Sequence, residues 1–120
     1  MSTDTYLAVF VGSMNSPRMA AWQALPEAER KKRESEGIAA WKGWMAKHQA
    51  AIIEIGGPLG KTKKIDAGGI ADISNLLSGF TVFRAASHEE AARLFENHPH
   101  FAIFPGDCVE VMPVLPIPAG

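Results

Sequence analysis

Two histidines near the C-terminus could take part in proton transfer. His98 and His100 flank Pro99, directly after a segment that is predicted to be helical. An imidazole has an ordinary pKa of about 6.5, so at a turn beside the mouth of a sheet it can serve as a general base or a ligand-binding donor. The alternative is structural, because a histidine at a helix C-terminus favours the helix dipole. We take His98 as a candidate catalytic residue and His100 as a candidate ligand-binding residue.

A third histidine lies on the face of a predicted helix. Ile38, Trp41, Met45, His48 and Ile52 follow one another at steps of three or four residues, the spacing of one face of an amphipathic helix. A histidine on such a face is usually a core or interface residue with one hydrogen bond. In a cleft it could instead transfer a proton, so His48 is a second candidate catalytic residue.

Two tryptophans and a lysine are candidates for contact with a ligand. Trp41 and Trp44 are either core residues or cleft walls that stack against a planar molecule. Lys61 belongs to a short basic run that either protects an edge strand from pairing with other chains or meets an acidic small molecule at the rim of a cleft. We name Trp41, Trp44 and Lys61, together with His100, as candidate ligand-binding residues.

The sequence matches no metal or nucleotide motif. The two histidines after the helix, Asp107 and Cys108 are close together, but their spacing fits no zinc site, which needs three or four converging donors. Residues 56–62 (Gly-Gly-Pro-Leu-Gly-Lys-Thr) resemble a phosphate-binding loop, but that motif needs a glycine where the chain has Ile55. We therefore expect no metal and no cofactor.

Composition indicates one small globular domain. A chain of 120 residues fits a single domain, residues 1–120 with a core at about 5–116. The net charge of -1 provides no basic field for nucleic acid or an anionic membrane, and no apolar run reaches the length of a membrane helix. A single cysteine excludes an internal disulfide and favours a reducing compartment. We expect a cytoplasmic protein.

Hydrophobic patterns and turn residues predict the order strand, helix, strand, strand, helix, strand. Ser16-Pro17 begins a short helix, and Leu25-Pro26 a longer one that is expected to end at residues 56–58 (Gly-Gly-Pro). Ser87 and Glu90 form a capping box for the last helix. For residues 70–78 the pattern does not decide between a strand, a loop and a helical turn. The four predicted strands are residues 6–12, 61–66, 79–85 and 107–112.

This order predicts an α+β fold of the ferredoxin-like βαββαβ type, and with it a homodimer. Two helices can cover only one face of a four-stranded sheet. The first strand nevertheless carries apolar side chains on both faces, such as Phe10 on one and Val9 on the other. Monomers rarely leave such a face in water, and a second copy packed sheet to sheet is the simplest cover.

Five segments together resemble the YCII-related (YciI-like, DGPF) family. The resemblance extends from about Thr5 to Pro116. The five segments are residues 56–59 (Gly-Gly-Pro-Leu) after a tryptophan-containing helix, 79–80 (Gly-Phe), 87–91 (Ser-His-Glu-Glu-Ala), 98–99 (His-Pro) and 106–113 (Gly-Asp-Cys-Val-Glu-Val-Met-Pro).

The resemblance implies a dimeric α+β barrel whose function is largely undefined. Some members are proposed enzymes, one relative is a muconolactone-type dehalogenase, and others are fused to or encoded beside transcription regulators. Enzyme-like members carry a histidine on the first long helix, which would fall near Ala40 or Trp41 here, and an acidic residue after the second strand, near Asp66. Asp66 thereby joins His98 and His48 as a catalytic candidate. Many members have Asp-Pro where this chain has His98-Pro99.

The sequence leaves open whether the protein is an enzyme. One hypothesis is an enzyme that acts on a small organic acid or lactone by proton transfer. The other is a non-catalytic dimer that binds a ligand or serves as a regulatory accessory protein. The expected partners are a second copy and a small molecule, and neither nucleic acid nor a membrane is expected.

Overall fold

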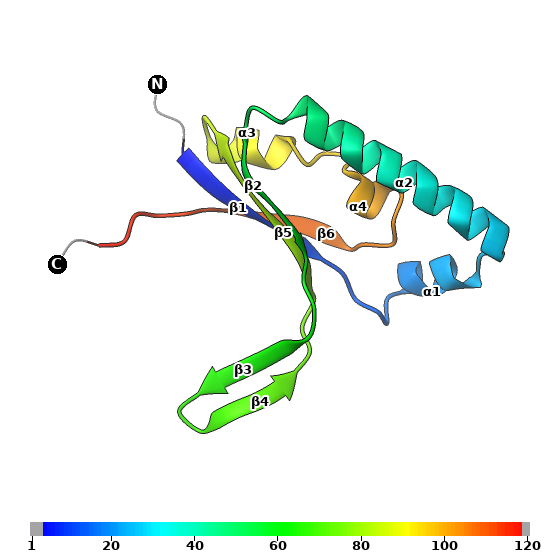
Figure 1. Ribbon diagram of the computed structural model, residues 1–120, viewed down its shortest axis with the longest axis horizontal. Helices are drawn as coiled ribbons and strands as arrows, with labels where there is room; N and C mark the ends of the chain where they lie inside the picture. Colours follow the sequence, from blue (N-terminus) through cyan, green and yellow to red (C-terminus); the bar gives the residue numbers. More distant parts are fainter. Residues whose placement is uncertain (1–3, 119–120) are drawn as a thin grey trace.

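The computed structural model describes residues 4–118, so residues 1–3 and 119–120 of the predicted domain lie outside the described range. Figure 1 shows a central sheet, a helical layer and a projecting hairpin. In chain order the elements are β1 (Asp4–Val11), α1 (Pro17–Ala24), α2 (Glu27–Lys47), β2 (Ile52–Pro58), β3 (Thr62–Asp66), β4 (Gly69–Ile73), β5 (Leu77–Ala85), α3 (His88–Arg93), α4 (Pro99–Ala102) and β6 (Cys108–Pro113).

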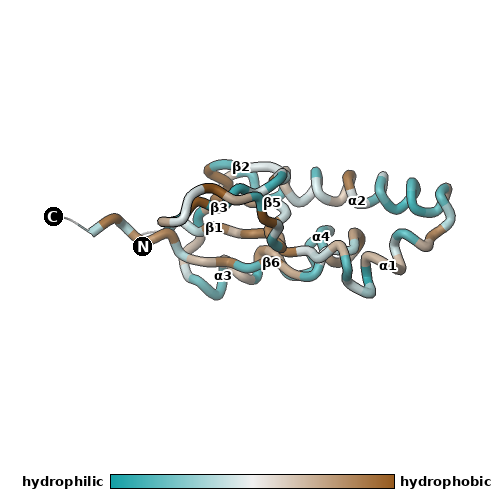
Figure 2. Tube along the Cα trace, turned by 90° about the horizontal axis from the view of Figure 1, so that it is seen from below, coloured by the Kyte–Doolittle hydropathy of each residue, from teal (hydrophilic) through white to brown (hydrophobic). Residues whose placement is uncertain are grey.

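Four strands form an antiparallel sheet in the order β2-β5-β1-β6. β1 is central, pairing Ala8 with Thr81 of β5 on one side and with Val111 of β6 on the other. Figure 2 shows mostly hydrophobic residues along β1, whereas the first half of α2 is largely hydrophilic. The α+β class predicted from the sequence is confirmed.

Two helices begin where their capping residues predict. The Oγ atom of Ser16 accepts a hydrogen bond from the Met19 N–H over 3.0 Å, and Pro17 follows in the first helical position. The Oγ atom of Ser87 accepts one from the Glu90 N–H over 3.1 Å. The predicted return bond from the Glu90 side chain is not among the hydrogen bonds of residues 4–118.

The long helix ends earlier than predicted. α2 stops at Lys47, and residues 52–55, predicted to continue it as far as a stop at residues 56–58, instead begin β2 beside β5. The apolar step from His48 to Ile52 matches a helical period, but Ile52 and Ile53 are β-branched, and Ile52 pairs with Phe83 of β5. Gly56, with a φ of 69°, follows as an irregularity within this strand.

The sheet position predicted for the second strand, residues 61–66, is also wrong. The sequence predicts residues 61–66 in the main sheet, but within residues 4–118 β3 pairs with β4 alone, in a separate two-stranded sheet. This β3–β4 hairpin projects from the body of the molecule (Figure 1). It turns between Asp66 and Gly69, and its second strand uses residues that the sequence left open. β2 therefore takes the sheet position predicted for residues 61–66.

The core lies between the helices and one face of the sheet. The buried cluster consists of Tyr6, Ala8, Phe10, Phe83, Ala91 and Phe95. Trp41 and Trp44 of α2 pack against it. Alternation along β1 places Leu7 and Val9 on the opposite face, beside Val82 of β5, and none of these three belongs to the cluster.

Candidate functional site

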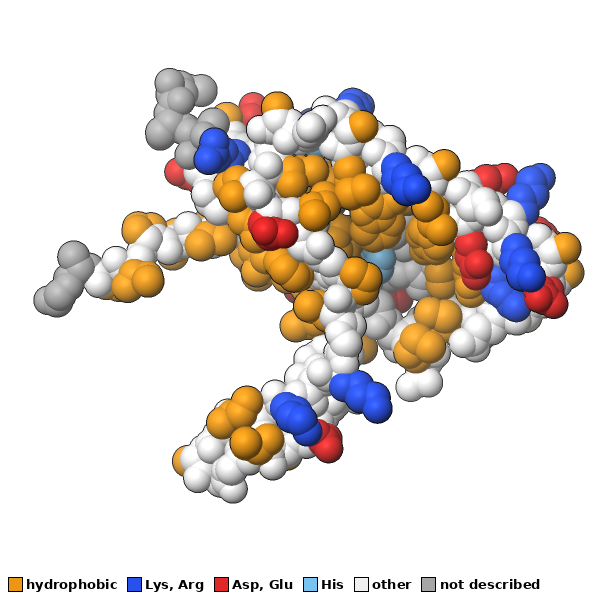
Figure 3. All heavy atoms as spheres, in the orientation of Figure 1, with side chains coloured by type: hydrophobic (Ala, Val, Ile, Leu, Met, Phe, Trp, Pro, Cys, Tyr) orange, Lys and Arg blue, Asp and Glu red, His pale blue; other side chains and the backbone are white. Residues whose placement is uncertain are grey.

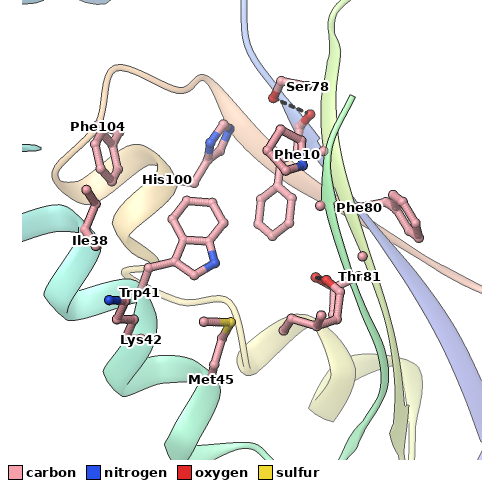
Figure 4. A pocket seen from close by; sticks show the side chains of 15 residues that line it. Phe10, Ile38, Trp41, Lys42, Met45, Ser78, Phe80, Thr81, His100 and Phe104 are labelled. Atoms are coloured by element: carbon pink, nitrogen blue, oxygen red, sulfur yellow. Dashed lines mark hydrogen bonds between the residues drawn. The ribbon is translucent and has the colours of Figure 1, made fainter. Parts of the chain in front are cut away.

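An apolar cavity of about 510 Å³ lies between α2, the β2–β5 strand pair and the segment around α4. Figure 3 shows hydrophobic side chains gathered around a hollow in this region, with a histidine visible inside it. Figure 4 shows the wall from close by. The lining residues are Phe10, Ile38, Trp41, Lys42, Met45, Ile55, Gly56, Gly57, Pro58, Ser78, Gly79, Phe80, Thr81, His100 and Phe104.

One face of α2 forms the helical wall. Ile38, Trp41, Lys42 and Met45 are spaced three, four and seven residues from the first, so their side chains share a face of the helix. Trp41 reaches farthest toward the sheet, with its ring 5.0 Å from that of Phe10 on β1 (Figure 4). The exposed Lys42 lies at the edge of this wall, and Figure 4 shows its amino group on the side away from β5.

Glycines make room on the strand side. Gly56 has a left-handed φ of 69°, and a Cβ atom there would collide with the Phe80 carbonyl. A Cβ on Gly79 would come within 3.3 Å of both the Gly57 carbonyl oxygen and the Phe10 ring. The strands can therefore approach each other closely here and still leave a hollow above them.

His100 is the buried histidine on the cavity wall, with 8% of its surface exposed. It belongs to α4, a short helix in the place where a turn was predicted. Its Nε2 atom lies 2.9 Å from the Val11 carbonyl oxygen, and because a carbonyl only accepts, Nε2 carries the proton of the neutral ring. Nδ1 keeps a lone pair. Among residues 4–118, no side chain hydrogen-bonds to this ring.

Burial lowers the pKa of His100 below its ordinary value, and the charge of Arg18 acts in the same direction. The hydrogen bond to the Val11 carbonyl, the negative charge of Asp107 and the backbone of Cys108 act against this change. The imidazole is therefore neutral at pH 7, with the proton on Nε2 and none on Nδ1.

His98 lies behind the cavity and not on its wall. It is fully buried, at 0% exposure, and its ring is enclosed by Trp41 at 4.5 Å, Trp44 at 4.8 Å and Phe10 at 5.2 Å. Burial lowers its pKa to about 4, with the charges of His100 and His48 adding to the effect. Its catalytic role stays a prediction, since the structure shows it inside the core as the N-cap of α4.

Two hydroxyl groups line the strand side of the cavity. Thr81 Oγ1 donates to the Ile55 carbonyl over 2.9 Å, and Ser78 Oγ donates to the Phe10 carbonyl over 2.9 Å. Each hydroxyl thus uses its proton within the protein and keeps oxygen lone pairs that can accept. Neither residue was predicted from the sequence as part of the site. Thr81 gives a signal in retrospect, as a polar residue on the inward face of a strand.

The structure brings some of the predicted site residues together. Trp41 and His100 both line the cavity, with ring centres 6.3 Å apart. Trp44 packs behind them, its Nε1 donating to the Leu94 carbonyl over 2.8 Å. His48 is the C-cap residue that follows α2, and its ring lies 5.0 Å from that of Trp44. Burial lowers its pKa, and the charge of Lys47 adds to this effect.

Two predicted site residues lie elsewhere. Asp66 ends β3 on the projecting hairpin, where it accepts from the Gly68 N–H over 2.8 Å. The exposed Lys61 lies between β2 and β3. Neither residue lines the cavity, so their functional roles stay predictions.

Within residues 4–118, no group of three or more His, Cys, Asp or Glu side chains could hold a metal ion. In the same range no helix has the length and apolar character to span a membrane. Cys108 is half-buried at the start of β6, and burial together with the charges of Glu110 and Asp107 raises the pKa of its thiol.

Comparison with known proteins links the chain to an enzyme by fold alone. No family model matches the chain, and neither does any curated protein sequence. Among solved structures it is similar to 5-chloro-2-hydroxyhydroquinone dehydrochlorinase (TftG) from Burkholderia phenoliruptrix AC1100, in complex with 2,5-dihydroxybenzoquinone. The match has a TM-score of 0.51 and 18% identity and covers 90% of each chain. The chain therefore shares the overall α+β fold of this dehydrochlorinase.

Proposed function

We propose that the protein is an enzyme that binds a small, flat, mostly apolar organic acid or lactone in the cavity and moves a proton with His100. The observation that carries the proposal is a neutral imidazole on the wall of an apolar cavity, held by the Val11 carbonyl. Such cavities, with few polar groups among apolar walls, are typical of small-molecule sites.

The proposed step is general base catalysis. Nδ1 of His100 takes a proton from a carbon beside a carbonyl, and the C–H electrons move onto the carbonyl oxygen as an enolate. The Val11 carbonyl and the charge of Asp107 favour the imidazolium that results. The proton then returns to the ligand or leaves to water. Likeness in fold to a dehydrochlorinase that was solved with a small ring compound supports a small-molecule role.

We also propose the family and assembly that the sequence suggests. The strand order β2-β5-β1-β6 fits a ferredoxin-like βαββαβ topology if the β3–β4 hairpin is an insertion between the second and third sheet strands. In the proposal the chain is a YCII-related protein of the cytoplasm. Two copies pair through the sheet face that carries Leu7 and Val82.

Proton exchange tests the enzymatic role. We would incubate the protein in D₂O with α-angelica lactone and with phenylpyruvate, and follow loss of the α-proton signal by ¹H NMR. His100→Gln keeps a side-chain donor but cannot accept the proton, so we expect exchange to slow about 100-fold or more. His88→Gln, at an exposed histidine, should leave the rate unchanged. Exchange at the buffer rate, or at an equal rate in His100→Gln, would refute the proposal.

One observation favours a non-catalytic ligand-binding or accessory role instead. Among the described residues, no Asp or Glu lines the cavity or hydrogen-bonds to the His100 ring, and Asp107 acts on it through its charge alone. His100 therefore lacks the hydrogen-bonded carboxylate that orients many catalytic histidines. If ligands bind in the cavity and no exchange occurs, this second function is the better explanation.

A further inference from the structure

We infer that the cavity selects a flat ring that carries both a hydroxyl group and a carbonyl or carboxylate oxygen. This inference rests on the proposed ligand-binding function of the cavity and adds the chemical class of the ligand. It comes from the hydrogen-bonding groups that the wall leaves unused.

The strand side of the cavity offers acceptors. Thr81 and Ser78 both line it, and both hydroxyl protons are already donated to backbone carbonyls of the protein. An oxygen whose proton is fixed in this way can still accept a hydrogen bond. A ligand that faces β5 is therefore best matched by a donor, such as a hydroxyl group.

The helix side offers a donor. The indole Nε1–H of Trp41 makes no hydrogen bond within residues 4–118, whereas that of Trp44 is bonded to Leu94. It is not sealed off by protein, because the one fully enclosed unpaired side-chain nitrogen in the described range is His98 Nε2. Figure 4 shows the Trp41 nitrogen on the side of the ring that faces Thr81. A carbonyl or carboxylate oxygen on the ligand would satisfy this donor.

The remaining wall explains why the ligand should be flat and otherwise apolar. Phe10, Met45 and Phe104 present no hydrogen-bonding groups, and the rings of Trp41 and Phe10 are tilted against each other at 5.0 Å. A pure hydrocarbon would fit these surfaces but would leave the Trp41 N–H without a partner once water is displaced. An unpaired buried donor is costly, so we expect the polar ligand to be favoured about tenfold, which corresponds to about 1.4 kcal/mol.

Three related probes separate the two hydrogen bonds. 4′-Hydroxyacetophenone has the hydroxyl and the carbonyl, 4′-methoxyacetophenone lacks the donor, and 4-ethylphenol lacks the carbonyl. We would measure their Kd values by ¹H–¹⁵N NMR, following the Trp41 indole signal, with the Trp44 indole signal as an internal control. We expect 4′-hydroxyacetophenone to bind about tenfold more tightly than either analogue.

Matched variants assign each preference to a residue. Thr81→Val should reduce the preference for hydroxyl over methoxy to about twofold, while Thr81→Ser should keep it. Ser78→Ala tests the same acceptor side at a more exposed position, should Thr81→Val fail to fold. Trp41→Phe should remove the preference for the carbonyl and leave the hydroxyl preference intact. Because this variant has no Trp41 indole signal, its Kd values are measured from the backbone amide signals of Gly57 and Thr81, which line the cavity.

The outcomes distinguish this inference from the proposed function. If all three probes shift the Trp41 indole signal with equal Kd values, the cavity binds ligands but the hydroxyl–carbonyl selection is wrong. The hydroxyl–carbonyl selection is also wrong if the hydroxyl preference survives in Thr81→Val and Ser78→Ala and the carbonyl preference survives in Trp41→Phe. If no probe shifts the Trp41 signal at millimolar concentration, both the inference and the proposed role of the cavity fail.

Discussion

Nδ1 of His98 accepts a hydrogen bond from the backbone N–H of His100 over 3.0 Å. This contact makes His98 the N-cap of α4, the helix that holds His100 on the cavity wall. It also fixes the tautomer of His98, because an accepting Nδ1 leaves the proton on Nε2, which is enclosed without a polar partner. Neutral His98 thus supports the position of His100, and protonation of His98 would remove that support.

Stability should therefore fall on mild acidification. The pKa of His98 is lowered from 6.5 to about 4 in the folded protein, so the unfolded chain binds the proton first as the pH falls. The contribution of neutral His98 to the free energy of unfolding is complete above pH 6.5. It is lost as the pH falls from 6.5 to about 4. At about 1.36 kcal/mol per pKa unit, the free energy of unfolding should drop by about 3 kcal/mol across this range. Urea unfolding at a series of pH values measures it.

A variant isolates the share of His98 in this pH dependence. Asparagine can also cap a helix but does not titrate, so His98→Asn should flatten the curve even though it loses packing and starts from a lower stability. Some slope should remain, because burial also lowers the pKa of His100. His88→Asn, at an exposed histidine, should keep the wild-type slope. An unchanged slope in His98→Asn would show that His98 is not the group responsible.

Gly106 should be needed for the position of His100. A Cβ atom on Gly106 would overlap Cε1 and Nε2 of the His100 ring, the part that bonds to Val11. Gly106→Ala should therefore displace the imidazole and destabilise the fold by about 1–3 kcal/mol, as overpacking does. Urea unfolding and the NMR shifts of His100 give the readout. Gly60→Ala, where a Cβ meets nothing within 4 Å, is the control and should change stability little.

The sequence predicted those parts of the fold that have strong local signals. Ser16-Pro17 and Ser87 mark helix starts through bonds that span three residues, and β1 and β5 are rich in β-branched and aromatic residues. The end of α2 could not be found in this way. Ile52 continues the apolar spacing of the helix and is also a good strand former, and only pairing with Phe83 decides between the two.

The site was also predicted in part, because only some of its residues have a signal in the local sequence. Trp41 and His100 stand out by residue type and do line the cavity. Thr81 looks like an ordinary strand residue until the register places it opposite Ala8, on the face toward the helices. The enclosure of His98 is a tertiary property, since its neighbours Phe10, Trp44 and Phe95 come from β1, α2 and the segment after α3.

Two glycines of α2 should respond in opposite ways to alanine. At Gly43 a Cβ meets nothing within 4 Å, so Gly43→Ala should stabilise the protein by about 0.5–1 kcal/mol through helix propensity alone. At the buried Gly37 a Cβ would overlap the Phe104 ring. Gly37→Ala should push Phe104 toward the cavity and cancel or reverse the gain. Thermal unfolding of both variants tests this, and equal stabilisation would show that Phe104 is not packed on Gly37.

The sheet face away from the helices should hold two copies together. Leu7 and Val82 are paired across β1 and β5 on this face, outside the buried core cluster, and Met112 beside Leu7 is 39% exposed. If a second copy covers this face, a charge at its centre must be buried without a partner, which is costly.

We expect the wild type to sediment as a dimer and Val82→Lys as a folded monomer. Ala39→Lys, which adds the same charge to the exposed side of α2, should remain dimeric. A wild type that is monomeric at tens of micromolar would show that this face needs no second copy, because the apolar pair would then be stable in water.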